Sequence, residues 1–144
     1  MSQRLGTPIE ALKASAAVVA LTSPTGNGAI LTLPTQQWCL LVSLYFQWVA
    51  AAGGASRTIG VLVKDAAGNI VWQTPLATGL AGAATLNGYL GGAVPISNNA
   101  GPPITFYAPI PFEFAIPPAC TVEVIDTAAV STSDTCLITA VVSV

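Results

Sequence analysis

The sequence predicts an all-β domain, an antiparallel β-sandwich of about eight or nine strands that follows an N-terminal arm. Three observations support this prediction. Apolar residues alternate along residues 37–49, Gly- and Pro-rich turn sequences separate many short apolar runs, and the one helix signal lies within residues 8–20. Many short strands without intervening helices are typical of a β-sandwich or a β-barrel.

The first fifteen residues differ from the rest and are predicted to form an arm, with residues 16–144 as a single domain. The segment is rich in charge for this chain and contains Gly6 and Pro8, which opens the short helix signal. Two interpretations stay open, a frayed terminus and an arm that docks on a neighbouring subunit. The candidate contact residues of a docking arm are Arg4, Leu5, Pro8, Ile9 and Leu12.

The clearest strand covers residues 37–49. Its large apolar residues share one parity, and they are Trp38, Leu40, Val42, Leu44, Phe46 and Trp48. Such a period of two predicts a strand with one buried face, which places both tryptophans in the core. A strand of this length is unusual, so we expect it to bend or to contain a bulge.

A β-hairpin is predicted over residues 58–74. Residues 58–64 and 70–74 flank the turn Asp65-Ala-Ala-Gly68-Asn69. Asp at the first position and Gly at the fourth fit a type I turn followed by a left-handed residue. The Asp65 carboxylate can accept hydrogen bonds from amides of the turn, and Gly68 can adopt a positive φ without strain.

Residues 76–103 contain six glycines and no charged residue. This segment is too long for an ordinary connection. Either it contains a short strand near Tyr89, or it forms a projecting loop of the kind that often carries a binding site. Tyr89 is therefore a candidate partner-binding residue.

Further strands are predicted on both sides of this segment. They cover residues 16–21, 29–33, 112–116, 121–125 and 137–144. Pro117 and Pro118 end one of them. Glu123 is expected to point outward between Val122 and Val124.

Composition limits the function classes. The chain has 144 residues, enough for one domain, with 53% hydrophobic and 7% charged residues, no His and a net charge of −2. Four Lys or Arg residues are too few for a nucleic-acid interface, and the lack of His excludes His-based catalysis and His-ligated metal. A free domain carries charge on about a quarter to a third of its surface positions. The charge shortage therefore predicts a subunit that is covered by other protein in an assembly.

No membrane segment is expected. The longest apolar block, residues 38–52, has 15 residues, whereas a spanning helix needs about 20. No signal peptide is expected either, because the first apolar run is short and follows Glu10 and Lys13. The chain is expected to fold in the cytoplasm in which it is made.

The carboxylates of the last third are Glu113, Glu123, Asp126 and Asp134. A pair of them could act as acid and base or bind Ca²⁺. However, their spacing matches no calcium loop, and Glu113 and Glu123 fall at outward positions of neighbouring strands, where a solvated charge is expected. We therefore predict no catalytic, cofactor or metal site, and no enzyme.

Cys39, Cys120 and Cys136 are odd in number. They are predicted to be buried thiols that act as small apolar residues, and whether Cys120 and Cys136 pair stays open. Trp72, beside the hairpin, is the most open of the three tryptophans for ligand contact.

Three sequence patterns carry a resemblance to a known group of proteins. They are D-x-x-G-N at residues 65–69, P-x-x-F-x-I-P-P at residues 111–118 and x-V-x-V-x-D at residues 121–126. Over residues 37–144 the chain resembles small β-sandwich structural proteins encoded in the virion gene clusters of tailed bacteriophages. The resemblance implies a jelly-roll-like fold and a virion protein, such as a capsid decoration or cement subunit.

The resemblance also implies partners and a location. The partners would be the major capsid protein or other virion subunits, which the chain would meet after synthesis in the host cytoplasm. A dimer or trimer is expected on separate grounds, because it would bury the excess apolar face and cover strand edges. Three alternatives remain. These are a receptor- or glycan-binding module of a tail fibre that uses Tyr89 and Tyr107, a small hydrolase that uses Glu113 and Glu123, and a membrane-inserting protein suggested by the mean hydropathy of +0.70.

Overall fold

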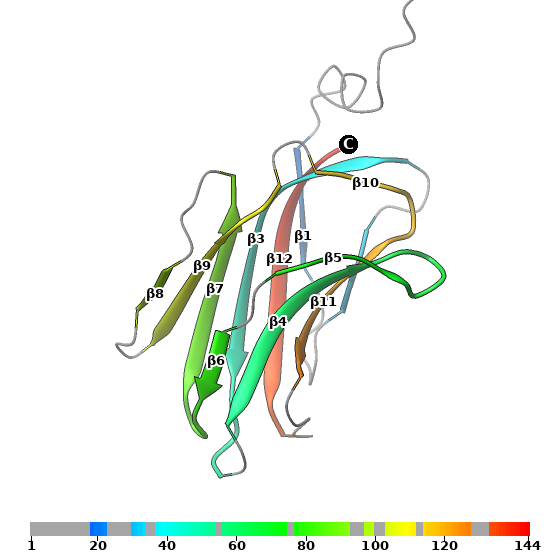
Figure 1. Cartoon of the computed structure of the whole chain (residues 1–144). Coiled ribbons are helices and arrows are strands. Elements are labelled where there is room, and N and C mark those ends of the chain that lie inside the picture. Colours follow the sequence, from blue (N-terminus) through cyan, green and yellow to red (C-terminus); the bar gives the residue numbers. More distant parts are fainter. Residues whose placement is uncertain are drawn as a thin grey trace, which may run out of the picture.

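The computed structural model describes residues 18–22, 30–33, 37–53, 56–74, 77–92, 97–99, 103–111, 114–127 and 133–144. In these ranges the chain forms twelve strands and no helix (Figure 1). The predicted arm, residues 1–15, and most of the helix signal lie outside the described residues.

The strands form two sheets. Sheet A has seven strands in the order β1-β12-β3-β7-β9-β8, with β10 also paired to β3. Its strands are β1 (Val18–Thr22), β3 (Cys39–Val49), β7 (Thr85–Gly91), β8 (Ser97–Asn99), β9 (Ile104–Pro109), β10 (Ala115–Ile116) and β12 (Thr135–Ser143). Sheet B has five strands in the order β2-β11-β4-β5, with β6 also paired to β4. Its strands are β2 (Ile30–Thr32), β4 (Arg57–Lys64), β5 (Ile70–Gln73), β6 (Ala77–Leu80) and β11 (Thr121–Asp126).

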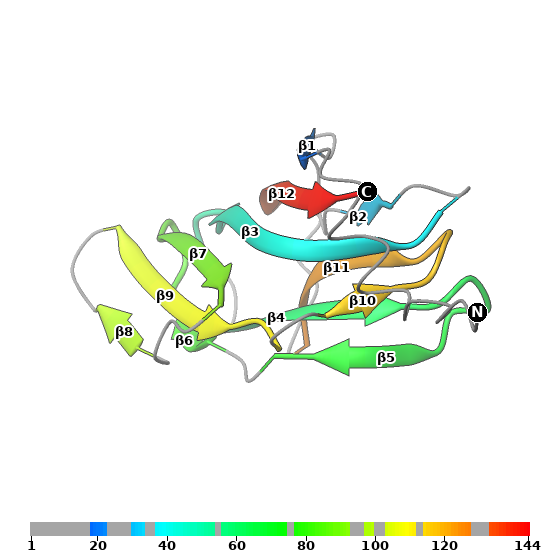
Figure 2. The same ribbon diagram turned by 90° about the horizontal axis from the view of Figure 1, so that it is seen from above.

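The strand pairing is that of a jelly roll. From the ends of the chain inward, β1 pairs with β12, β2 with β11, β3 with β7 and β4 with β5. The pairs alternate between the two sheets, so β1-β12-β3-β7 packs against β2-β11-β4-β5 (Figures 1 and 2). Eight strands wound in this way make a two-sheet jelly roll. The predicted β-sandwich is confirmed.

Two details of that prediction are corrected. The described residues contain twelve strands rather than eight or nine, because β6, β8, β9 and β10 are short additions to the eight strands of the roll. The pairing is also not purely antiparallel, because β9 lies parallel to β7. β6, β8 and β10 have two to four residues each, which show too little alternation to be recognised in a sequence, whereas β9 has six.

β3 contains the expected bulge, at Val42. Ser43 lies opposite Val141 of β12 and Leu41 lies opposite Val142, so Val42 is an extra residue on β3. The bulge inverts the alternation, because an insertion of one residue moves the following side chains to the other face. Leu44, Phe46 and Trp48 are buried as predicted. For the residues up to the bulge, the predicted burial of Trp38, Leu40 and Val42 is wrong.

There, the buried residues are Cys39 and Leu41, whereas Val42 is 47% exposed and Trp38 is 42% exposed. Trp38 is therefore not part of the core. Trp72 is half-buried, and its ring lies 5.4 Å from that of Phe114 between centroids.

The hairpin of β4 and β5 is confirmed. Gly68 has a φ of 88°, and its N–H donates to the Asp65 carbonyl oxygen. Asp65 Oδ1 accepts hydrogen bonds from the amides of Ala67 and Asn69 at 2.9 and 2.8 Å. The Asp and the Gly thus have the roles that the turn sequence predicts.

The glycine-rich segment forms strands, which decides between its two interpretations. Tyr89 lies within β7, between β3 and β9 in sheet A. Gly88 makes this arrangement possible, because the Phe46 ring of β3 occupies the space of a side chain there. A Cβ at Gly88 would lie 2.0 Å from Phe46 Cε1.

In the last third, β11 and β12 form where strands are predicted; of the predicted strand at residues 112–116, residues 112–113 lie outside the described residues and β10 covers Ala115–Ile116. Val122 and Val124 of β11 are buried, Glu123 is partly exposed between them, and β12 is the final strand. The largest side chains of the core are Trp48, Phe46, Leu33, Leu44, Ile59, Leu86, Ile116 and Ile138.

The three cysteines are buried thiols, as predicted. Burial raises the pKa of the Cys39 thiol to about 11, with a further contribution from the neighbouring Cys120, and burial also raises the pKa of Cys120. These groups therefore stay protonated at neutral pH, where a thiol is a poor nucleophile.

Replacing Gly88 by alanine should destabilise the fold by about 3 kcal/mol, because the added methyl group overlaps the buried Phe46 ring. Urea unfolding followed by tryptophan fluorescence measures the effect. The matched control is Gly92→Ala, where a Cβ meets nothing within 4 Å. Equal stability of the two variants would contradict the packing described for Gly88.

The thiols should not react with a thiol reagent at pH 8 in the folded protein and should all react in denaturant, because all three are buried and burial raises the pKa of Cys39 and Cys120. Absorbance of the released chromophore measures this. Rapid labelling of the folded protein would contradict the burial of these residues.

Candidate functional site

The charged side chains of the described residues lie either in the interior of the fold or at one end of sheet B. Six of the ten charged residues are described, and they are Arg57, Lys64, Asp65, Glu123, Asp126 and Asp134. Arg57, Asp126 and Asp134 are buried. The other three lie near the turn between β4 and β5.

The Asp134 carboxylate is the centre of a buried polar cluster. It accepts hydrogen bonds from Arg57 Nε at 3.0 Å and from Arg57 Nη2 at 2.9 Å, a two-pronged ion pair. Trp48 Nε1 and the Ala51 amide also donate to it, at 3.2 and 2.8 Å. Arg57 donates further to the carbonyl oxygens of Gly53 and Ala51. The cluster joins the ends of β3, β4 and β12.

The protonation state of Asp134 follows from these contacts. Burial by itself raises the pKa of Asp134, but the hydrogen bonds from Arg57, Ala51 and Trp48 and the Arg57 charge outweigh it, so the pKa lies below its usual value. The hydrogen bonds that Arg57 donates to Asp134, together with the Asp134 charge, raise the pKa of Arg57. An ionised carboxylate held by four donors is not available as a proton donor, and its contacts tie the ends of three strands together.

The remaining described carboxylates also have structural contacts. Glu123 pairs with Lys64 at 2.6 Å, and the Thr58 amide donates to Asp126 Oδ1 at 2.9 Å. Glu113, the other half of the acid–base pair considered above, lies outside the described residues. Within the described ranges no three His, Cys, Asp or Glu side chains are grouped to hold a metal ion.

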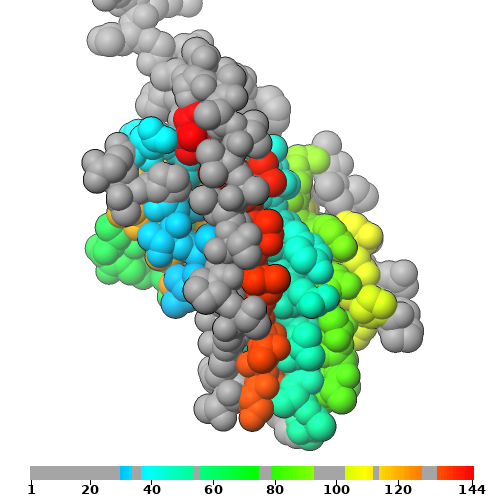
Figure 3. Space-filling model, turned by 180° about the vertical axis from the view of Figure 1, so that it is seen from behind, coloured from blue at the N-terminus to red at the C-terminus, as the bar shows by residue number. Residues whose placement is uncertain are grey.

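The outer face of sheet A has no charged side chain among its described residues. We call the outward residues of β12, β3, β7 and β9 the charge-free face (Figure 3). They are Leu137, Thr139, Val141, Ser143, Val42, Ser43, Tyr45, Gln47, Val49, Thr85, Asn87, Tyr89, Gly91, Thr105, Tyr107 and Pro109. Val42, Val49 and Tyr89 are at least 40% exposed.

Three tyrosines form a row across the charge-free face. Tyr45 of β3 lies opposite Tyr89 of β7, which lies opposite Tyr107 of β9. Their ring centroids are 4.9 and 5.5 Å apart, and the second pair is stacked at 19°. Tyr45 Oη donates to Asn87 Oδ1 at 3.1 Å. Partial burial and the neighbouring Tyr89 raise the pKa of Tyr45, so its phenol adds no charge to the face at neutral pH.

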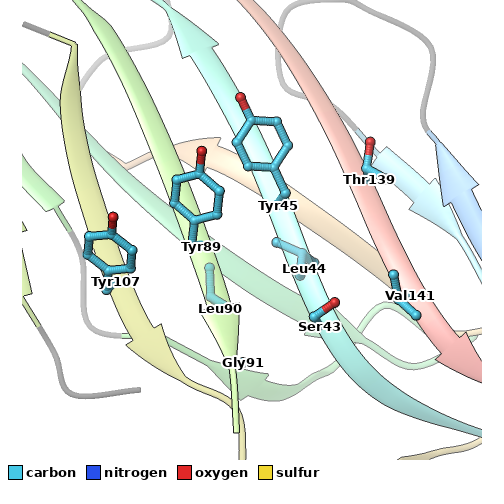
Figure 4. A pocket seen from close by; sticks show the side chains of 9 residues that line it. All are labelled: Ser43, Leu44, Tyr45, Tyr89, Leu90, Gly91, Tyr107, Thr139 and Val141. Atoms are coloured by element: carbon cyan, nitrogen blue, oxygen red, sulfur yellow. The ribbon is translucent and has the colours of Figure 1, made fainter. Parts of the chain in front are cut away.

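A depression lies beside the tyrosine row. The adjacent row across the sheet contains small residues, with Val141 opposite Ser43 and Ser43 opposite Gly91. The step from tyrosines to small side chains leaves a depression of about 380 Å³. Figure 4 shows that the three tyrosine hydroxyls point the same way, away from Ser43 and Gly91. The lining residues are Ser43, Leu44, Tyr45, Tyr89, Leu90, Gly91, Tyr107, Thr139 and Val141.

The structure thus connects some of the sequence candidates and not others. Tyr89 and Tyr107 lie side by side in the row, and Tyr45 is a member that sequence analysis missed. The alternation of Tyr45 with the buried residues Leu44 and Phe46 indicates in the sequence that Tyr45 points outward. Its alignment with Tyr89, however, depends on strand register. The arm candidates Arg4, Leu5, Pro8, Ile9 and Leu12 lie outside the described residues.

The comparisons leave function to be argued from this geometry. No family model matches the chain, and no curated protein is significantly similar to it. Among the described residues there is no helix long and apolar enough to cross a membrane.

Replacing Asp134 by asparagine should lower the free energy of unfolding by about 3 kcal/mol, because Arg57 keeps its charge in a buried position without a counter-ion. The control Glu123→Gln breaks the more exposed Lys64 pair and should cost less than about 1 kcal/mol. Urea unfolding at pH 7 measures both. Equal losses would contradict the central role of Asp134.

The lowered pKa of Asp134 predicts a pH dependence. Its contribution to stability is complete above the unfolded-state pKa of about 3.9 and is lost as the pH falls through the lower folded-state pKa. The loss of stability below about pH 4 should therefore be smaller in Asp134→Asn than in the unmodified protein. Unfolding midpoints measured across the acid range would show identical slopes if the pKa of Asp134 were unshifted.

Proposed function

We propose that the chain is a non-enzymatic structural subunit of a tailed-phage virion, a decoration or cement protein that binds and stabilises the head. The observation that carries this proposal is the charge-free face of sheet A. Jelly rolls occur in viral capsid proteins but also in lectins and cupins, so the fold is compatible with the proposal without selecting it.

A face of this kind suits permanent contact with protein. The face presents Val42, Val49 and Tyr89 to solvent without a charge among its described residues. Extended apolar patches on a soluble protein mark interaction sites. Apolar contacts are worth about 25 cal/mol per Å² and persist when salt changes, whereas ion pairs at the surface are screened. A subunit that must stay bound to a particle benefits from this property.

The arm provides the second part of the proposal. Its candidate contact residues Arg4, Leu5, Pro8, Ile9 and Leu12 would hold the sandwich on the major capsid protein or another virion subunit. This assignment follows from the charge and the apolar residues of the segment. It leaves the charge-free face available for a different contact.

The tyrosine row supports a second candidate function, a glycan-binding module of a tail fibre. Aromatic rings that line an open depression are suited to the apolar faces of sugars. This candidate is weakened by the small number of side chains that could form hydrogen bonds with a sugar. Apart from the tyrosines, the lining offers the side-chain hydroxyls of Ser43 and Thr139. Sugar hydroxyls buried there without partners would cost free energy, so the geometry favours protein as the ligand.

The full chain should co-sediment with empty phage heads up to a fixed number of copies per head and should raise the temperature at which the heads rupture. Deleting residues 1–13 should weaken binding at least about tenfold if the arm supplies the contact, which is a loss of about 1.4 kcal/mol. Circular dichroism checks that the sandwich of the deletion variant stays folded.

Two results would contradict the proposal. One is a full chain that does not bind heads at any concentration tested. The other is specific binding on a glycan array that is lost in Tyr89→Ala, which would support the tail-fibre module instead. Unchanged head binding by the deletion variant would contradict the role of the arm alone.

A further inference from the structure

The charge-free face carries a projection and a depression side by side. The bulge of β3 pushes Val42 outward, and its side chain is 47% exposed. The next residue, Ser43, already lines the depression beside the tyrosine row. Val42 is short and branched, and the depression is bounded by rings and small side chains. A surface that carries both shapes can be complementary to a copy of itself.

The chemistry of the depression selects an apolar, uncharged occupant. No lining residue is charged, and Tyr45 already donates its hydroxyl proton to Asn87. An acidic or basic peptide would find no counter-charge, and a sugar would leave hydroxyls unpaired. Tyrosine is enriched at the energetic centre of protein interfaces, and Tyr89, in the middle of the row, is 42% exposed.

Charge also favours a second copy of this chain as the partner. In a two-fold contact the same face of both copies is buried, so a charged residue near the axis would lie close to the identical charge of the other copy and be repelled by it. The face avoids this repulsion because none of its described residues is charged. Among the described residues, the charged side chains that are partly exposed, Lys64, Asp65 and Glu123, belong to sheet B or the turn beside it.

The size of the face is sufficient for a weak to moderate dimer. Four strands about 4.8 Å apart and seven residues long, at about 3.4 Å per residue, give a footprint of roughly 450 Å². Stable interfaces begin at about 600 Å² of accessible surface per partner, and side-chain relief makes accessible surface larger than a flat footprint. The face is therefore of the right order for self-association.

We infer that two copies of the chain pack their charge-free faces together about a two-fold axis, with Val42 of each copy against the tyrosine-lined depression of the other. The inference rests on the proposed function, in which this face is a contact within an assembly, and names the partner at that face. Sheet A of each copy is then covered, as the inner face of a sheet is covered in a sandwich.

Light scattering after size exclusion and sedimentation equilibrium, over about 1 to 100 µM protein, test the inference. The full chain should have twice the mass of one chain. Val42→Lys should raise the dimer dissociation constant roughly 100-fold, because the interface would bury two unpaired ammonium groups, one from each copy. The matched control is Val71→Lys on β5, where a valine of nearly equal exposure, 49%, lies on sheet B. It should leave the dimer intact.

A second variant keeps the test decisive if Val42→Lys folds poorly. Tyr89→Lys changes an exposed side chain at the centre of the row and should also give monomers. A monomeric full chain, a trimer, or a dimer that survives both lysine variants would overturn the inference. Equal disruption by Val71→Lys would do so as well.

Head binding separates this inference from the proposed function. A monomer that binds empty heads would overturn the dimer and leave the virion role in place. A dimer that is sensitive to Val42→Lys and does not bind heads would support the face-to-face contact and overturn the virion role.

Discussion

The buried carboxylate of Asp134 connects the two sheets of this sandwich at one end. Its oxygens accept hydrogen bonds from Trp48 in sheet A and from Arg57 in sheet B, as well as from the Ala51 amide that follows β3. A carboxylate in an apolar interior is costly unless several donors surround it, and here they do. β3, which carries Tyr45, ends at this cluster, and β12, its neighbour in sheet A, begins there, so the cluster fixes one end of the part of the sheet that holds the tyrosine row.

The same cluster helps to explain the surface. With only ten charged residues in the chain, each charge used in the interior leaves fewer for the outside. Arg57, Asp126 and Asp134 are buried, and the described charges that remain gather at the end of sheet B. The outer face of sheet A is then built from tyrosine, valine and neutral polar side chains. An assembly subunit needs such a face, whereas a solitary soluble domain has more charge.

The site itself arises from register. Tyr45, Tyr89 and Tyr107 are separated by 44 and 18 positions along the chain but meet because β3, β7 and β9 are neighbours with these residues in line. Gly88 allows β7 to lie close to β3 by leaving room for Phe46. The extra residue Val42 gives the face its projection. Three local features, a glycine, a bulge and a small-residue row, thus convert a flat sheet into a shaped surface.

Local patterns in the sequence determined the all-β class, the hairpin at Asp65 and Gly68, the buried parity of Leu44, Phe46 and Trp48, and the burial of the cysteines, because alternation and turn chemistry act between residues close in the chain. Only the tertiary structure decided that Trp38 is exposed, that the glycine-rich segment is a central part of sheet A, and that three distant tyrosines share a row. Those features depend on which strands pair and on a one-residue shift in their register. Such pairing is set by the packing of the whole core, which no single stretch of sequence contains.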